Sequence, residues 1–213
     1  MKTIQKQSQP FCKNKCNRRS FILKSIYSSI GITLSPSLLS SSQTSFLGNR
    51  QSKEDIYKQL DDLVDKYFPI LETCSQTSFN ALNQAFNLKS ENLIKALASF
   101  PGIAFRGETC GAVSACLLGI ALVYEEDSNN SEKQRLSSGP SINFCERFES
   151  EFGSTRCRDV IRKMTNKEYQ VLKPEDYEIL AKEGVFNSCP IVVKKALHIA
   201  ADIILEKPNI ILK

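Results

Sequence analysis

Four of the eight cysteines in this 213-residue chain stand where the sequence begins an apolar helical run. A sulfur at a helix N-terminus faces unpaired backbone N–H groups and the positive end of the helix dipole, and both favour the thiolate over the thiol. Thiolates bind metal ions and carry out thiol–disulfide exchange. The four cysteines are Cys74, Cys110, Cys157 and Cys189.

The segments around these cysteines predict helices. Cys110 opens a nearly all-apolar run, and Pro190 after Cys189 suits the first position of a helix that ends near Lys207. Further helices are predicted over 55–71, 90–100, 141–152 and 174–182, and the polar stretch 128–139 predicts a surface loop. No alternation of period two is sustained. The predicted fold class is therefore all-α, a compact multi-helix bundle-like domain with a disordered or signal N-terminal segment.

The N-terminal segment carries its own signal. Arg18 and Arg19 precede Phe21, a modestly apolar stretch and a serine-rich boundary, which resembles a twin-arginine export signal. No A-x-A cleavage site follows, so the segment is expected either to be cut near its serines or to stay as an uncleaved anchor; the alternative is a disordered basic tail. We divide the chain into a leader at 1–45, a linker at 46–53, a helical domain at 54–207 and a tail at 208–213.

Charge excludes one class of partner. The net charge is +5, but residues 1–45 hold seven Lys or Arg and no acid, which leaves 21 basic and 23 acidic residues for the rest. The body is close to neutral, so nucleic-acid binding loses its electrostatic support. A body of this size buries a core without covalent links, which makes disulfides optional for folding.

Several segments together resemble the C-GCAxxG-C-C family of redox-active proteins over about residues 54–207. These segments are the one that begins at Cys74, the lead-in FPGIAFRGET, CGAVSA from Cys110, FGSTRC to Cys157, and Cys189 before the last helix. The resemblance implies a small helical protein that uses its four cysteines in redox or metal chemistry. It also implies a redox partner or a membrane transporter as partner. Ala115 departs from the family motif, which has glycine there. The backbone supports that the resemblance assigns to the site, as cofactor-binding positions, are Gly107, Gly111 and Gly153.

Three alternatives stay open for the four cysteines. In the first, one thiolate attacks a substrate disulfide and a second cysteine resolves it, as in an oxidoreductase. In the second, all four hold a zinc ion or an iron–sulfur cluster. In the third, they form structural disulfides in a non-enzymatic binding or transporter-accessory module.

The remaining candidate residues are expected to lie outside the site. Cys116 and Cys145 fit buried apolar positions, and Cys12 and Cys16 fall in the leader. His198, the one histidine, lies half a turn around its helix from Cys189 and predicts a structural role.

Overall fold

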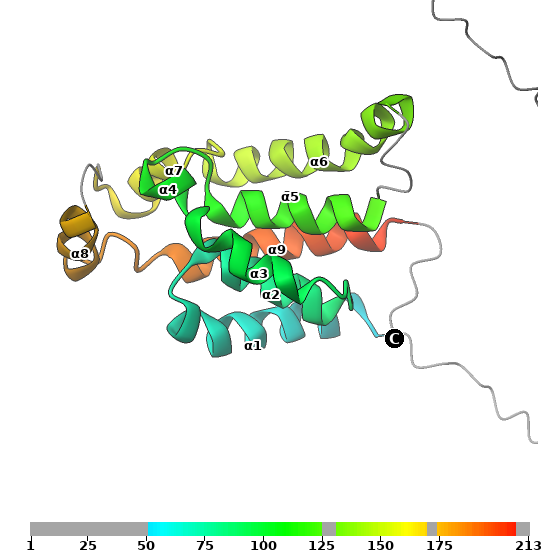
Figure 1. The fold of residues 1–213 in the computed structure, drawn as a ribbon, viewed down its shortest axis with the longest axis horizontal. Helices are drawn as coiled ribbons and strands as arrows, with labels where there is room; N and C mark the ends of the chain where they lie inside the picture. The colour runs from blue at the N-terminus through cyan, green and yellow to red at the C-terminus, as the bar shows by residue number, and fades with distance from the viewer. Residues whose placement is uncertain (1–50, 125–130, 170–173, 208–213) are drawn as a thin grey trace, which may run out of the picture. The chain divides into compact units, whose positions relative to one another are not determined.

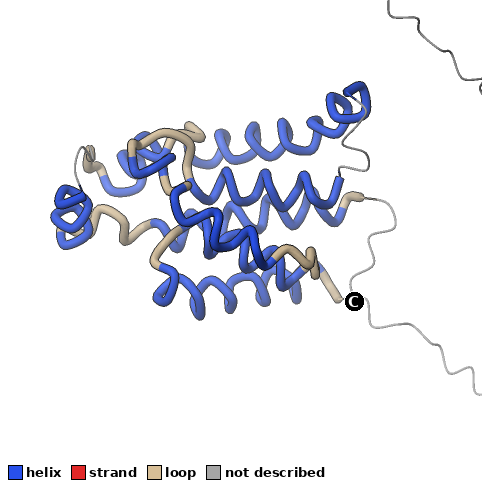
Figure 2. The backbone as a smooth tube through the Cα atoms, in the orientation of Figure 1, coloured by secondary structure: helices blue, strands red, loops and turns tan. Residues whose placement is uncertain are grey.

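The computed structural model describes residues 51–124, 131–169 and 174–207, and all of its regular elements are helices. The predicted all-α fold is therefore confirmed for these residues. The predicted leader and tail lie outside them. None of the described helices combines the length and the apolar character needed to cross a bilayer. Figure 2 shows the absence of strands from the described part of the chain. The helices are α1 (Lys53–Leu71), α2 (Cys74–Ala85), α3 (Glu91–Ala96), the 3-10 turn η1 (Leu97–Ser99), α4 (Gly102–Phe105), α5 (Gly111–Tyr124), α6 (Ser131–Phe152), α7 (Cys157–Thr165), α8 (Pro174–Lys182) and α9 (Cys189–Leu205).

The apolar helix α5 lies at the centre. It packs against α2, α6 and α9, while α1 packs against α2 and α9 (Figure 1). Each outer helix turns one apolar stripe inward: Ile56, Leu60 and Val64 of α1 are buried at intervals of four residues. Phe144 and Phe148 of α6 repeat the same spacing. The core therefore follows directly from the helical periodicity of the sequence.

The N-terminus of α1 is fixed by a capping box. The Asp55 backbone N–H donates to the Ser52 hydroxyl at 3.1 Å, and the Ser52 backbone N–H donates to the Asp55 carboxylate at 3.1 Å. Two otherwise unpaired donors are satisfied, which fixes where α1 begins. The helix ends at Leu71, and the left-handed backbone of Glu72 turns the chain toward Cys74.

One prediction is wrong in part. The stretch 128–139 was expected to be a loop, but α6 begins at Ser131 and continues through Pro140. Residues 132–136 are Glu, Lys, Gln, Arg and Leu, which all have good helix propensity. The Ser138 hydroxyl also donates to the Arg135 carbonyl oxygen at 2.6 Å, so a polar side chain bonds within the helix. Local propensity here outweighs the lack of an apolar period.

The helix starts gather at one end of the molecule. α2, α5 and α9 all begin at the end where α4, α7 and α8 lie, and they run away from it (Figure 1). The positive ends of three helix dipoles therefore point into the same region. Cys74, Cys110 and Cys189 stand at these three starts, and Cys157 begins α7 at the same end.

Candidate functional site

Each of the four cysteines stands at a helix start, as predicted, but one position differs from the others. Cys74, Cys157 and Cys189 are the first residues of α2, α7 and α9. Cys110 immediately precedes α5, whose first residue is Gly111. A residue in that preceding position accepts hydrogen bonds from the second and third N–H groups of the helix, and Cys110 does so from Ala112 and Val113. Cys110 is therefore the sulfur that the helix itself stabilises as an anion.

Short backbone pairing brings Cys110 next to Cys157. The segments around Thr109 and Arg156 form an isolated antiparallel bridge. The Cys110 N–H donates to the Thr155 carbonyl oxygen at 2.9 Å, and the Cys157 N–H donates to the Glu108 carbonyl oxygen at 2.6 Å. The starts of α5 and α7 are thus joined by main-chain hydrogen bonds. Two sulfurs that are 47 positions apart in the sequence become neighbours.

The lack of a side chain at Gly111 lets Cys74 approach the start of α5. A Cβ atom added at Gly111 would lie 2.6 Å from the Cys74 sulfur and 3.1 Å from the Ser75 nitrogen. Only glycine lets the start of α2 approach α5 this closely. The Ser75 hydroxyl donates to the Leu97 carbonyl oxygen at 2.8 Å, which fixes α2 from its other side. Gly111, predicted as a backbone support, is therefore the position on which the contact between Cys74 and Cys110 depends.

The pKa values of the sulfurs are perturbed in opposite directions. Hydrogen bonds from the thiols of Cys157 and Cys74 hold the pKa of Cys110 well below its usual range, and the backbone N–H groups of α5 add to this. The hydrogen bond to Cys110, together with burial, raises the pKa of Cys74 and of Cys157. Burial and then the charge at Cys110 raise the pKa of Cys189 to about 12. Of the four sulfurs, Cys110 is therefore the one whose surroundings most favour the thiolate.

Three of these sulfurs line a pocket of about 510 Å³: Cys74, Cys157 and Cys189. Cys110 is the most buried of the four, at 5% exposed, while Cys189 is half-buried. All six cysteines in the described residues are free thiols, and these residues hold no group of three or more His, Cys, Asp or Glu side chains that could bind a metal ion. The metal and disulfide alternatives therefore stay predictions.

Tyr169 is a site residue that the sequence did not indicate. Its hydroxyl donates to the Cys157 sulfur at 2.9 Å, and this hydrogen bond favours the Cys157 thiolate. Burial raises the pKa of Tyr169 itself, which keeps the hydroxyl protonated as a donor. Tyr169 lies in a polar stretch after α7 with no apolar period and no motif. No sequence signal could have singled it out.

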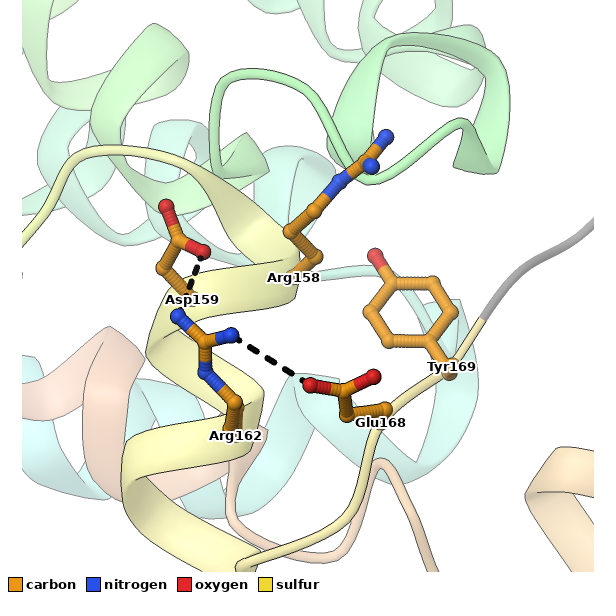
Figure 3. A pocket seen from close by; sticks show the side chains of 5 residues that line it. All are labelled: Arg158, Asp159, Arg162, Glu168 and Tyr169. Carbon is orange, nitrogen blue, oxygen red and sulfur yellow. Dashed lines mark hydrogen bonds and ion pairs between the residues drawn. The ribbon is translucent and has the colours of Figure 1, made fainter.

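Figure 3 shows Tyr169 together with the charged residues that lie beside it. Its hydroxyl is directed toward the start of α7, and a second pocket opens beside it. In that pocket Arg162 pairs with Asp159 at 3.2 Å and with Glu168 at 3.3 Å. Arg158 reaches back to the Arg106 carbonyl oxygen at 2.8 Å, so it ties α7 to the segment before Cys110. The Arg162–Glu168 pair thus links α7 to the loop that carries Tyr169.

The remaining predicted glycines have different surroundings. Gly107 adopts φ +77°, and an added Cβ there would lie 2.9 Å from the Arg158 Nε atom. Gly153 adopts φ +80° at the end of α6, where a side chain would have space but the backbone would be strained. Both glycines shape the two segments that pair between α5 and α7. Gly102, which was not predicted, adopts φ +52°, and its Cβ would lie 3.3 Å from the Tyr169 hydroxyl.

The other candidates that the structure describes lie where the sequence predicted. Cys116 is fully buried in the core, and Cys145 is half-buried against it. Ala115 is buried beside Phe79, so the extra methyl group is accommodated in a small apolar cluster. His198 stacks on Tyr57 at 4.0 Å and is paired with Asp61 at 2.9 Å, which is a structural role. Cys12 and Cys16 fall outside the described residues.

Comparison with known proteins identifies one family. The profile of the family described as "Putative redox-active protein (C_GCAxxG_C_C)" matches residues 72–203, a segment that includes all four cysteines. No curated protein and no solved structure matches the chain. Because the matched segment covers more than half of the sequence, the chain belongs to the C_GCAxxG_C_C family of redox-active proteins.

Proposed function

We propose that this protein is a thiol–disulfide oxidoreductase in which Cys110 and Cys157 exchange two electrons with a substrate. One observation carries the proposal: main-chain hydrogen bonds hold Cys110 and Cys157 together at the starts of α5 and α7, and Cys157 both lines the pocket and accepts a hydrogen bond from Tyr169. Cys157 is thus the sulfur that a ligand in the pocket can reach and that has a hydrogen-bond donor, Tyr169, beside it. The membership of a redox-active family supports the same reading.

The reaction begins with a proton transfer. The proton of the Cys157 thiol passes along its hydrogen bond to Cys110, and the Tyr169 hydroxyl stabilises the new Cys157 thiolate. This thiolate attacks one sulfur of a substrate disulfide, so a mixed disulfide forms. The departing substrate thiolate takes the proton held by Cys110. Cys110 is then an anion again.

The second step closes the protein disulfide. The Cys110 thiolate attacks the Cys157 sulfur, the mixed disulfide breaks, and the second substrate sulfur leaves as a thiolate. The protein loses two electrons and the substrate disulfide gains them. We assign supporting roles to Cys74 and Cys189, which line the same pocket and whose pKa values are raised.

The test uses the reduced full-length protein under anaerobic conditions with hydroxyethyl disulfide as substrate. Alkylation and peptide mass spectrometry are expected to show one new disulfide between Cys110 and Cys157. Cys110→Ser and Cys157→Ser are expected to abolish it, whereas Cys145→Ser, a half-buried control outside the site, retains it. Unchanged exchange in both site variants would refute the proposal.

The other roles drawn from the sequence stay predictions with tests of their own. Metal analysis and visible absorption of anaerobically purified protein would reveal zinc or an iron–sulfur cluster on the same four cysteines. Structural disulfides would instead be present in the purified protein, and their reduction would unfold it. Replacing Arg18 and Arg19 with lysine is expected to block export and to separate the protein from any membrane transporter that it serves.

A further inference from the structure

The pocket beside the cysteines has a chemical character that the thiol site alone does not explain. Besides the three sulfurs, five aromatic side chains line it. Among its described lining residues, Glu72 is the only charged one. A volume of about 510 Å³ lies within the usual range for small-molecule sites, roughly 300–1,000 Å³. The five aromatic residues are Phe68, Phe105, Tyr169, Tyr177 and Phe186.

Four of these rings form a continuous wall. Phe105 contacts Tyr177 with ring centroids 4.7 Å apart, and Tyr177 stacks on Phe186 at 5.1 Å with planes 23° apart. Phe186 and Tyr169 then form a T-shaped pair with ring centroids 5.6 Å apart, and Tyr169 is hydrogen-bonded to Cys157. The wall therefore leads from the pocket side of α8 to the reactive sulfur. Flat aromatic ligands gain most from such a surface.

The backbone that carries Phe105, the first ring of this wall, is strained. Residues 102–105 follow one another in the left-handed region, with φ of +52° at Gly102 and +60° at Phe105. L-residues adopt this conformation at a cost of about 1–2 kcal/mol each. Strain of this kind persists where the surroundings impose it, and it concentrates at ligand sites. Here the strained turn places Phe105 in the pocket wall.

The charge of the pocket lining favours some redox ligands over others. Among its described residues the lining contains Glu72 and no Lys, Arg or His, so this part of the wall offers phosphates and carboxylates no cationic partner. Phosphorylated nucleotides and acidic peptide thiols are disfavoured.

Of the seven exposed large apolar side chains in the described part of the chain, five stand within two positions of a lining residue in the sequence. They are Ile70, Phe100, Ile103, Ile179 and Ile191.

We propose that this aromatic pocket binds a quinone, a neutral planar two-electron acceptor, and that the cysteine pair reduces it. The inference rests on the proposed thiol function and names the oxidant. Asn187 and Tyr177 carry hydrogen-bond donors at the pocket wall that suit the carbonyl oxygens of a quinone.

The reaction balances with one added proton. The Cys110 thiolate and the Cys157 thiol become a disulfide, so one S–S bond forms and the S–H bond of Cys157 breaks. The two electrons pass to the quinone. The Cys157 proton and one proton from water bind the two quinone oxygens and yield the hydroquinone.

The test compares two tryptophan variants on α8. Ala181 lines the pocket, whereas its neighbour Lys182 does not belong to the lining; both are exposed. Ala181→Trp fills the pocket and Lys182→Trp is the matched control. The probe is duroquinone, a fully methylated benzoquinone without a free ring carbon for thiol addition. Reduced protein is mixed with it anaerobically, and hydroquinone and protein disulfide are both counted.

We expect wild type and Lys182→Trp to form one hydroquinone per disulfide. Ala181→Trp is expected to react at least about tenfold more slowly, which corresponds to about 1.4 kcal/mol of lost binding. The oxidised protein, which transfers no electrons, supplies a second readout. The chain has six tyrosines and no tryptophan, so duroquinone should quench the tyrosine fluorescence of the wild type in a saturable way.

Three results would overturn the inference, and they differ in what else they affect. If hydroxyethyl disulfide oxidises Cys110 and Cys157 but duroquinone neither binds nor reacts, the quinone site is refuted and the proposed thiol function stands. If neither oxidant forms a disulfide at these cysteines, the proposed function fails as well. Equal reaction of the two tryptophan variants with duroquinone would place quinone reduction outside this pocket.

Discussion

The contact between α2 and α5 makes Gly111→Ala the most informative single substitution. The added Cβ would lie 2.6 Å from the Cys74 sulfur, about 1 Å inside the optimal separation of non-bonded atoms. Rotation of Cys74 alone does not relieve the crowding, because the Ser75 nitrogen and Cβ both lie at 3.1 Å. Ser75 is fully buried and hydrogen-bonded to Leu97, so α2 itself has to shift.

The size of the effect follows from this overpacking. Added atoms in a packed interior cost about 1–3 kcal/mol, and each kcal/mol lowers the melting temperature of a domain of this size by about 2–4 °C. We therefore expect Gly111→Ala to lower the melting temperature by roughly 2–12 °C. The shift also weakens the hydrogen bond from Cys74 to Cys110, so the pKa of Cys110 is expected to rise toward its usual range.

Calorimetry and the pH dependence of alkylation measure the two effects separately. Gly139→Ala is the matched control, since nothing lies within 4 Å of its added Cβ and it stands inside α6. That control is expected to gain about 0.5–1 kcal/mol from its helix propensity. If Gly111→Ala behaves like Gly139→Ala in both assays, the close approach of Cys74 to α5 is wrong.

Other perturbations test the remaining contacts. Tyr169→Phe removes the donor to Cys157. Because a hydrogen bond to a charged group contributes about 1.5–3 kcal/mol, exchange with hydroxyethyl disulfide should slow by about tenfold or more; an unchanged rate contradicts the role of the hydroxyl. Burial raises the pKa of Cys189 to about 12, so its stabilising contribution is full below the unfolded value of about 8.5 and is lost as pH rises toward 12. The free energy of urea unfolding of the reduced protein over that range should fall by about 1.4 kcal/mol per pH unit more in wild type than in Cys189→Ala, and equal slopes would argue against a raised pKa for this thiol. Arg158→Ala removes two hydrogen bonds to backbone carbonyl oxygens before α5 and is expected to cost about 1–2 kcal/mol in the same assay; a neutral effect would show that this loop is held without it.

Periodicity predicted the parts of the fold that depend on local sequence. The helices α1, α8 and α9 begin and end close to the predicted residues, because each has an apolar stripe with proline or acidic residues in its first turn. The placement of the four cysteines at helix starts was also predictable. The start of α6 was missed, since helix propensity without an apolar period resembles a polar loop.

The relations between the cysteines could not be predicted from the sequence. The different position of Cys110 depends on a helix boundary of one residue, which is finer than periodicity resolves. The pairing of Cys110 with Cys157 depends on a single antiparallel bridge between two loops. Tyr169 reaches Cys157 through tertiary packing from a stretch that has no pattern of its own. Contacts that are set by close approach or by loop pairing leave little trace in sequence spacing.

A redox titration tests the central claim most directly. Full-length protein is equilibrated in thiol–disulfide buffers of graded potential, trapped by alkylation, and mapped by peptide mass spectrometry. We predict a single two-electron transition that removes two thiols together and yields a Cys110–Cys157 disulfide. Both sulfurs remaining alkylatable at every potential, or a first disulfide at Cys116 or Cys145, would contradict a redox site centred on the Cys110 thiolate.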